Sequence, residues 1–89
     1  MPYIKKEKRA ELDSWINMIW PLIAEPGDLT YVICRLMWRL WQTDQWGRNF
    51  TTWTMLRSAV EEAVSDFWKR IIEPYEEKQM MENGDVYTD

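Results

Sequence analysis

The sequence predicts an all-α fold, a small bundle of three main helices followed by a short C-terminal helix and a tail. Apolar residues recur at spacings of three and four along most of the chain, which is the period of an amphipathic helix. Turn-forming residues at Pro26-Gly27, Gly47 and Gly84 separate these periodic stretches. No strand is needed to account for the pattern. We therefore expect one small helical domain over residues 1–89.

The first helix is expected from Leu12, where the apolar stripe begins, and Pro21 should kink its last turn. A second helix is expected from Asp28 to Gln42, with Asp28 as its N-cap. Two sides of this second helix are apolar. The predicted core face consists of Leu29, Val32, Ile33, Leu36, Met37 and Leu40. A second flank, roughly opposite, consists of Tyr31, Cys34, Trp38 and Trp41. Such a helix lies at the centre of its bundle or meets another subunit.

A third helix is expected from about Trp53 to Ile72, capped by Thr51 or Thr52. Pro74 should break or bend the helical path, because proline lacks the backbone donor that a helix interior uses. The segment from Tyr75 to Glu82 then predicts a short helix that ends at Asn83-Gly84.

Self-association is expected from the composition. A chain of 89 residues buries a small fraction of its surface, and its seven tryptophans carry more apolar area than one thin core readily hides. Cys34 is the only cysteine, so no intrachain disulfide can add stability, and it is expected to be a small core residue. There is no histidine. We therefore expect a homo-oligomer with no cofactor and no metal site.

The net charge of −4 argues against general nucleic-acid binding. Basic residues gather near the N-terminus and acidic residues near the C-terminus, so opposite ends could attract each other. No apolar run approaches the length of a membrane span, and the N-terminus lacks the apolar core of a signal peptide. The expectation is a cytoplasmic protein with no membrane partner.

Arg35 and Arg39 lie one helical turn apart, and two guanidinium groups so spaced can bind a phosphate or a carboxylate. Tyr31 and Trp38 nearby could stack a base, which predicts a small anionic nucleotide as ligand. The alternative is an internal ion pair with acidic residues of the third helix or the tail. The sequence leaves this choice open.

A second constellation consists of carboxylates. Glu62 and Asp66 lie one turn apart, and with Glu76 and Asp85 they suggest a magnesium-dependent nucleotide hydrolase as an alternative function. Soluble helices carry such acidic pairs routinely. No residue is singled out as catalytic, since no histidine is available as a base.

Four segments resemble a family of small uncharacterised phage and prokaryotic proteins: MPYI at 1–4, PGDLTYVICRL at 26–36, FWKRIIEPYEEK at 67–78 and ENGDVY at 82–87. The resemblance implies a small stand-alone domain, often viral, with no activity assigned. It emphasises residues that form either a site or structural punctuation: Pro26, Gly27, Asp28, Arg35, Pro74, Tyr75, Glu76, Asn83, Gly84, Asp85 and Tyr87. Of these, Arg35, Tyr75, Asp85 and Tyr87 are candidate ligand-binding residues. The tryptophan-rich segment WRLWQTDQWGRNFTTW departs from the family pattern.

These observations favour a small self-associating interaction protein, phage-encoded, that acts as an accessory or counter-defence factor in the host cytoplasm. Self-association is expected through the aromatic flank of the second helix. The expected target is a host protein or a nucleotide signal. A structural virion or assembly component is a further alternative.

Overall fold

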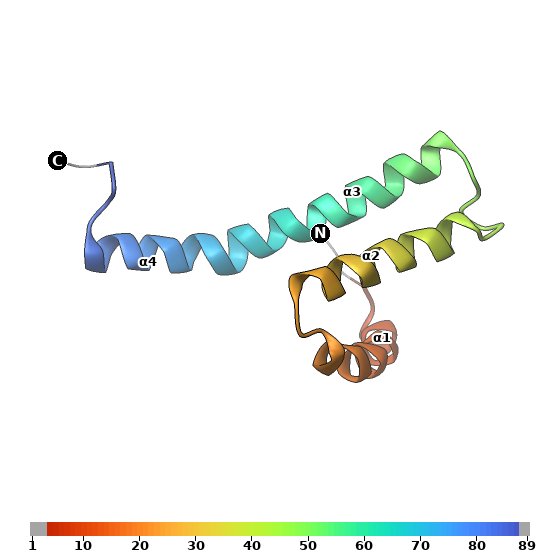
Figure 1. The fold of residues 1–89 in the computed structure, drawn as a ribbon, viewed down its shortest axis with the longest axis horizontal. Coiled ribbons are helices and arrows are strands. Elements are labelled where there is room, and N and C mark those ends of the chain that lie inside the picture. The colour runs from red at the N-terminus through yellow and green to blue at the C-terminus, as the bar shows by residue number, and fades with distance from the viewer. Residues whose placement is uncertain (1–3, 88–89) are drawn as a thin grey trace. The chain divides into compact units, whose positions relative to one another are not determined.

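The structure, a computed structural model, describes residues 4–87 and is all-α, with no strand in that range. Its elements in order are α1 (Lys6–Ile19), a 3-10 turn (Trp20–Leu22), α2 (Pro26–Trp41), α3 (Phe50–Phe67), a π-helical turn (Trp68–Ile72) and α4 (Glu73–Asn83) (Figure 1). The predicted all-α class is confirmed. The bundle arrangement with a short C-terminal helix stays a prediction. Of the resemblance segment MPYI, only Ile4 lies within the described residues, and Thr88 and Asp89 of the tail lie outside them.

The chain divides into two compact units, one ending at Leu56 and the other starting at Arg57, and each is described by itself. Helix α1 begins the first unit at Lys6, six residues before the predicted start. Lysine, glutamate and arginine are good helix formers, so the charged lead-in extends the helix. The α-helix ends at Ile19, and Pro21 lies in the following 3-10 turn.

Helix α2 begins at Pro26, and the prediction that Asp28 is its N-cap is wrong. Proline suits the first helical position because its missing N–H would have no helical partner there. Asp28 lies two residues further on, and its carboxylate accepts hydrogen bonds from the backbone amides of Ala24 (2.9 Å) and Glu25 (3.1 Å). Asp28 therefore fixes the entry into the helix from inside the first turn.

The loop between α2 and α3 is held by backbone and side-chain hydrogen bonds. Gly47 has a φ of +82° and donates its N–H to the carbonyl oxygen of Thr43 at 2.8 Å. Asn49 caps α3, because its side-chain oxygen accepts the N–H of Thr52 at 2.9 Å. The predicted caps Thr51 and Thr52 are therefore wrong. The Thr52 hydroxyl instead donates to the carbonyl oxygen of Trp46.

Burial is low throughout the described residues, and only Thr52 and Leu56 are buried. On the predicted core face of α2, Val32, Ile33, Met37 and Leu40 are half-buried. Leu29 and Leu36 of the same face are exposed, Leu36 by 59%, so this part of the core prediction is wrong. The first unit therefore closes around a small centre at the α2–α3 loop.

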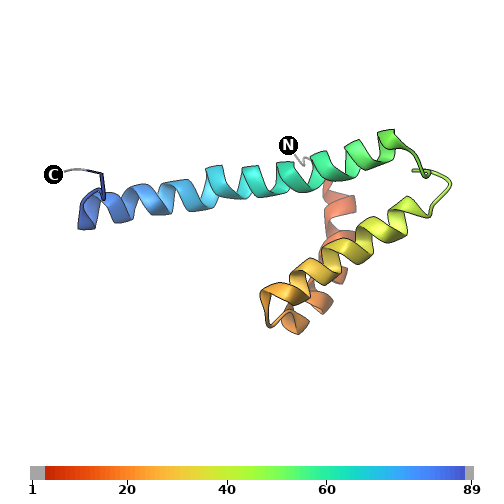
Figure 2. The same ribbon diagram turned by 45° about the horizontal axis from the view of Figure 1, so that its top comes forward.

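In the second unit the backbone stays helical through α3, the π turn and α4, and Figures 1 and 2 both show this run. Pro74 does not break this helical run. A π turn precedes it, and the wider i→i+5 pairing of that turn accommodates a residue that has no backbone N–H. The side chain of Arg57 donates a hydrogen bond to the carboxylate of Glu61 at 2.8 Å. This contact raises the pKa of the Arg57 guanidinium. Gly84 ends α4 with a φ of +86°, at the position predicted for the helix stop.

Candidate functional site

Four of the predicted ligand-binding residues lie on α2 in the first unit. Tyr31, Arg35 and Trp38 follow one another at spacings of four and three residues, and Arg39 lies one turn after Arg35. All four side chains are exposed. Within this unit, neither guanidinium forms an ion pair with a described residue. The α2 residues therefore present an accessible cationic and aromatic surface, which we call the arginine surface.

Beside this surface lies an apolar groove of about 370 Å³, the tryptophan groove. Its α2 side contributes Cys34, Met37, Trp38 and Trp41, and the first turns of α3 contribute Trp53 and Leu56. The sequence predicts an aromatic flank on this side of α2, and in the structure Trp53 and Leu56 of α3 line the same groove as that flank. These two residues lie near the start of α3, and the apolar pattern within α2 carries no signal for them.

Cys34 lines the tryptophan groove and is exposed, so the prediction of a small core residue is wrong. The helix carries it on the side facing the groove, and the groove is open. Its thiol is accessible to any molecule that enters.

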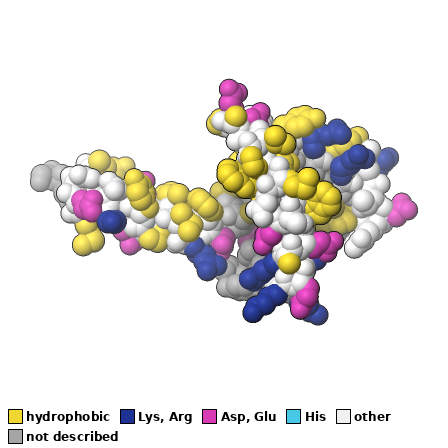
Figure 3. Space-filling view, turned by 90° about the horizontal axis from the view of Figure 1, so that it is seen from below, with side chains coloured by type: hydrophobic (Ala, Val, Ile, Leu, Met, Phe, Trp, Pro, Cys, Tyr) yellow, Lys and Arg dark blue, Asp and Glu magenta, His cyan; other side chains and the backbone are white. Residues whose placement is uncertain are grey.

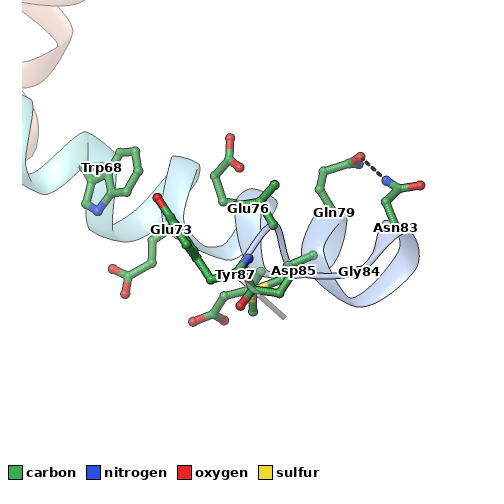
Figure 4. Close-up of a pocket in the computed structure, with 11 residues that line it drawn as sticks. Trp68, Glu73, Glu76, Gln79, Asn83, Gly84, Asp85 and Tyr87 are labelled. Atoms are coloured by element: carbon green, nitrogen blue, oxygen red, sulfur yellow. Dashed lines mark hydrogen bonds between the residues drawn. The ribbon is translucent and has the colours of Figure 1, made fainter. Parts of the chain in front are cut away.

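The other predicted residues, Tyr75, Asp85 and Tyr87, lie in the second unit. Asp85 and Tyr87 line a depression of about 520 Å³ at the end of α4 (Figure 4). The Asp85 side chain accepts the backbone N–H of Tyr87 at 2.9 Å, which turns the chain just after Gly84. Tyr75 does not line the depression.

The C-terminal depression is acidic and partly aromatic. Its lining includes Glu73, Glu76, Glu77 and Asp85, with Trp68 at one end and Tyr87, which is 92% exposed, on the side of Glu73 (Figure 4). Its charge is opposite to that of the arginine surface on α2. No group of three or more His, Cys, Asp or Glu side chains placed to hold a metal ion occurs among residues 4–87.

A third feature is an exposed apolar face on the helical run of the second unit. It consists of Val60, Val64, Phe67, Trp68, Ile71 and Tyr75, and we call it the α3–α4 seam. All but Val60, which is half-buried, are exposed. Figure 3 shows hydrophobic side chains open to the surface on the face it presents, among scattered charged groups.

Comparison with known proteins places the chain in a family. The model of the family described as "Domain of unknown function (DUF6899)" matches residues 1–86, and the protein belongs to that family. No curated protein and no solved structure matches the chain. Among the described residues, no helix has both the length and the apolar character required to cross a membrane.

Proposed function

We propose that this protein is a small helical interaction protein that self-associates and binds an anionic partner on α2. One observation carries the proposal. Large apolar side chains are exposed on every main helix, among them Trp15 on α1, Trp38 on α2, Phe67 on α3 and Tyr75 on α4. Exposed apolar surface that continues over neighbouring residues, as at Phe67, Trp68 and Ile71, marks an interaction site. Contact with another copy would bury area that this fold leaves open.

The binding half of the proposal rests on the arginine surface. Arg35 and Arg39 supply positive charge without an ion-pair partner among the described residues of their unit, and Trp38 joins them to the tryptophan groove. A partner that combines an anionic group with an aromatic or apolar part fits both features. A nucleotide signal and an acidic surface of a host protein share this chemistry. The role of a phage-encoded accessory or counter-defence factor, which we propose for the protein, would use such binding.

The test is charge reversal at α2. The double variant Arg35→Glu/Arg39→Glu should abolish binding without unfolding the protein, since both side chains are exposed. The matched control is Lys6→Glu/Arg9→Glu, which makes the same charge change on exposed positions of α1. Binding is read from the shift in melting temperature and from tryptophan fluorescence, with nucleotides, cyclic dinucleotides and polyglutamate as probes. Equal binding by both double variants, or none by the wild type, would refute the proposed α2 site.

The alternative functions gain no specific support. Glu62 and Glu76 lie on the same helical run, separated by 14 residues, which at 1.5 Å per residue is about 20 Å. The carboxylates suggested for a magnesium-dependent hydrolase are therefore not gathered at one place in one chain. Nothing in the structure favours a virion component.

A further inference from the structure

The spacing of the α3–α4 seam fits the pairing of two helices. Val60, Val64, Phe67 and Ile71 follow at four, three and four, as in the repeat of helices that pack side by side, and Trp68 lies beside Phe67. The last step, from Ile71 to Tyr75, is also four and crosses the end of the π turn. A π turn absorbs one extra residue, so Tyr75 can stay on the same face.

We infer that the α3–α4 seam pairs with the same seam of a second copy, antiparallel and centred between Phe67 and Trp68. This inference rests on the proposed self-association and names the surface that carries it. It moves the contact between copies away from α2, where the sequence placed it. The tryptophan groove already has Trp53 and Leu56 on one side and stays open for the proposed partner.

The area of the seam is of the size that a dimer needs. Val64 is 67% exposed and Trp68 is 51% exposed, and Phe67, Ile71 and Tyr75 are each more than half exposed. A fully buried aromatic side chain contributes about 150–250 Å², so Phe67, Trp68 and Tyr75, each just over half exposed, offer about 300 Å² per copy. The smaller Val64 and Ile71 raise this to about 500 Å². Two copies would bury about 1,000 Å² from these residues alone, which is about the area that a specific interface should reach.

The seam also has a recess for a partner's side chain. Val60, Val64 and Trp68 line a shallow apolar depression of about 440 Å³, with Glu61 and Ser65 on its border. Aromatic residues that fill such pockets commonly dominate the binding energy of an interface. In the antiparallel pairing, Ile71 and Tyr75 of the second copy lie opposite Val64 and Val60, which line this recess.

Charge favours the antiparallel orientation. Pairing centred between residues 67 and 68 sets Asp66 opposite Lys69 of the second copy and next to its Arg70. Within one chain, Arg70 and Asp66 are 4.0 Å apart, a loose ion pair in which the side chain of Arg70 is 60% exposed and that of Asp66 is 22% exposed. A parallel pairing in register would set Asp66 against Asp66, and like charges that face each other oppose association.

Charged substitutions test the seam. The variant Val64→Asp/Ile71→Asp should raise the dissociation constant of the dimer by about 100-fold or more, the scale at which loss of interface anchors acts. The control is Met81→Asp, which alters an apolar side chain that is 85% exposed and lies off the seam. Sedimentation measures the dissociation constant, and circular dichroism checks that each variant keeps its helix content.

Cross-linking tests the orientation in a Cys34→Ser background. Oxidation of a mixture of Val64→Cys and Ile71→Cys chains should give a mixed disulfide, while each variant alone stays unlinked. Linkage of each variant to itself would show a parallel pair and overturn the inference. The wild type could be a dimer whose dissociation constant is unchanged by Val64→Asp/Ile71→Asp and whose mixed cysteine chains form no disulfide. That result would overturn the seam and leave the proposed self-association standing. A wild-type monomer would overturn the proposed self-association as well.

Discussion

Gly47 is predicted to be the most sensitive glycine, and Gly47→Ala to be strongly destabilising. The residue has a φ of +82°, which side chains other than glycine's rarely adopt. A Cβ atom at this position would lie 3.0 Å from the side-chain nitrogen of Asn49. Asn49 is the cap of α3, so the substitution both strains the loop and presses on the residue that starts the helix.

The magnitude follows from these two effects. A left-handed backbone costs a residue with a Cβ about 1–2 kcal/mol. Disturbing an asparagine cap costs typically about 1 kcal/mol. The free energy of unfolding should therefore fall by about 2–3 kcal/mol, which for a chain of this size lowers the melting temperature by about 10 °C or more.

The two other glycines separate these effects. Gly84 has a φ of +86° but no atom within 4 Å of an added Cβ, so Gly84→Ala should show the strain alone. Gly27 lies in the first turn of α2 with open space around it, and Gly27→Ala should stabilise the protein by about 0.5–1 kcal/mol. Urea denaturation followed by circular dichroism, at one protein concentration for all variants, measures the series. If Gly47→Ala is as stable as Gly27→Ala, the assignment of this loop is wrong.

Three further predictions concern the centre of the first unit and its groove. Thr52→Val removes the hydroxyl that donates to Trp46 and should cost about 1–3 kcal/mol in urea denaturation, whereas Thr52→Ser keeps that donor and most of the stability. Leu56→Ala empties the only buried apolar position among residues 4–87 and should cost at least about 2 kcal/mol in the same assay. Cys34 should react with a thiol reagent in the native protein as fast as in urea, because its side chain is exposed; strong protection would contradict the open groove.

The helical class could be predicted from the sequence because periodicity and turn residues are local signals. Gly84 ends α4 at the predicted place, since few residues other than glycine tolerate a positive φ. The boundaries were less predictable where two cap residues compete. Asn49 caps α3 in place of Thr51 or Thr52, and it does so because the turn at Gly47 brings its side chain to the helix end.

Burial could not be predicted from the same pattern. The periodic stripes on α2 and α3 are identical in form to core faces, yet Leu36, Val64 and Ile71 are exposed. An apolar stripe reveals which face needs cover and says nothing of whether the cover comes from the same chain. The arginine surface was predictable from helical spacing, whereas the tryptophan groove was not, because Trp53 and Leu56 reach it from another helix.

Self-association is the central claim, and sedimentation of the wild-type protein over a range of micromolar concentrations tests it most directly. The exposed apolar faces predict a species of twice the chain mass of 10.9 kDa, which dissociates only on dilution. A single species of 10.9 kDa that stays soluble across the whole range would contradict the claim, because the exposed tryptophans would then need no partner.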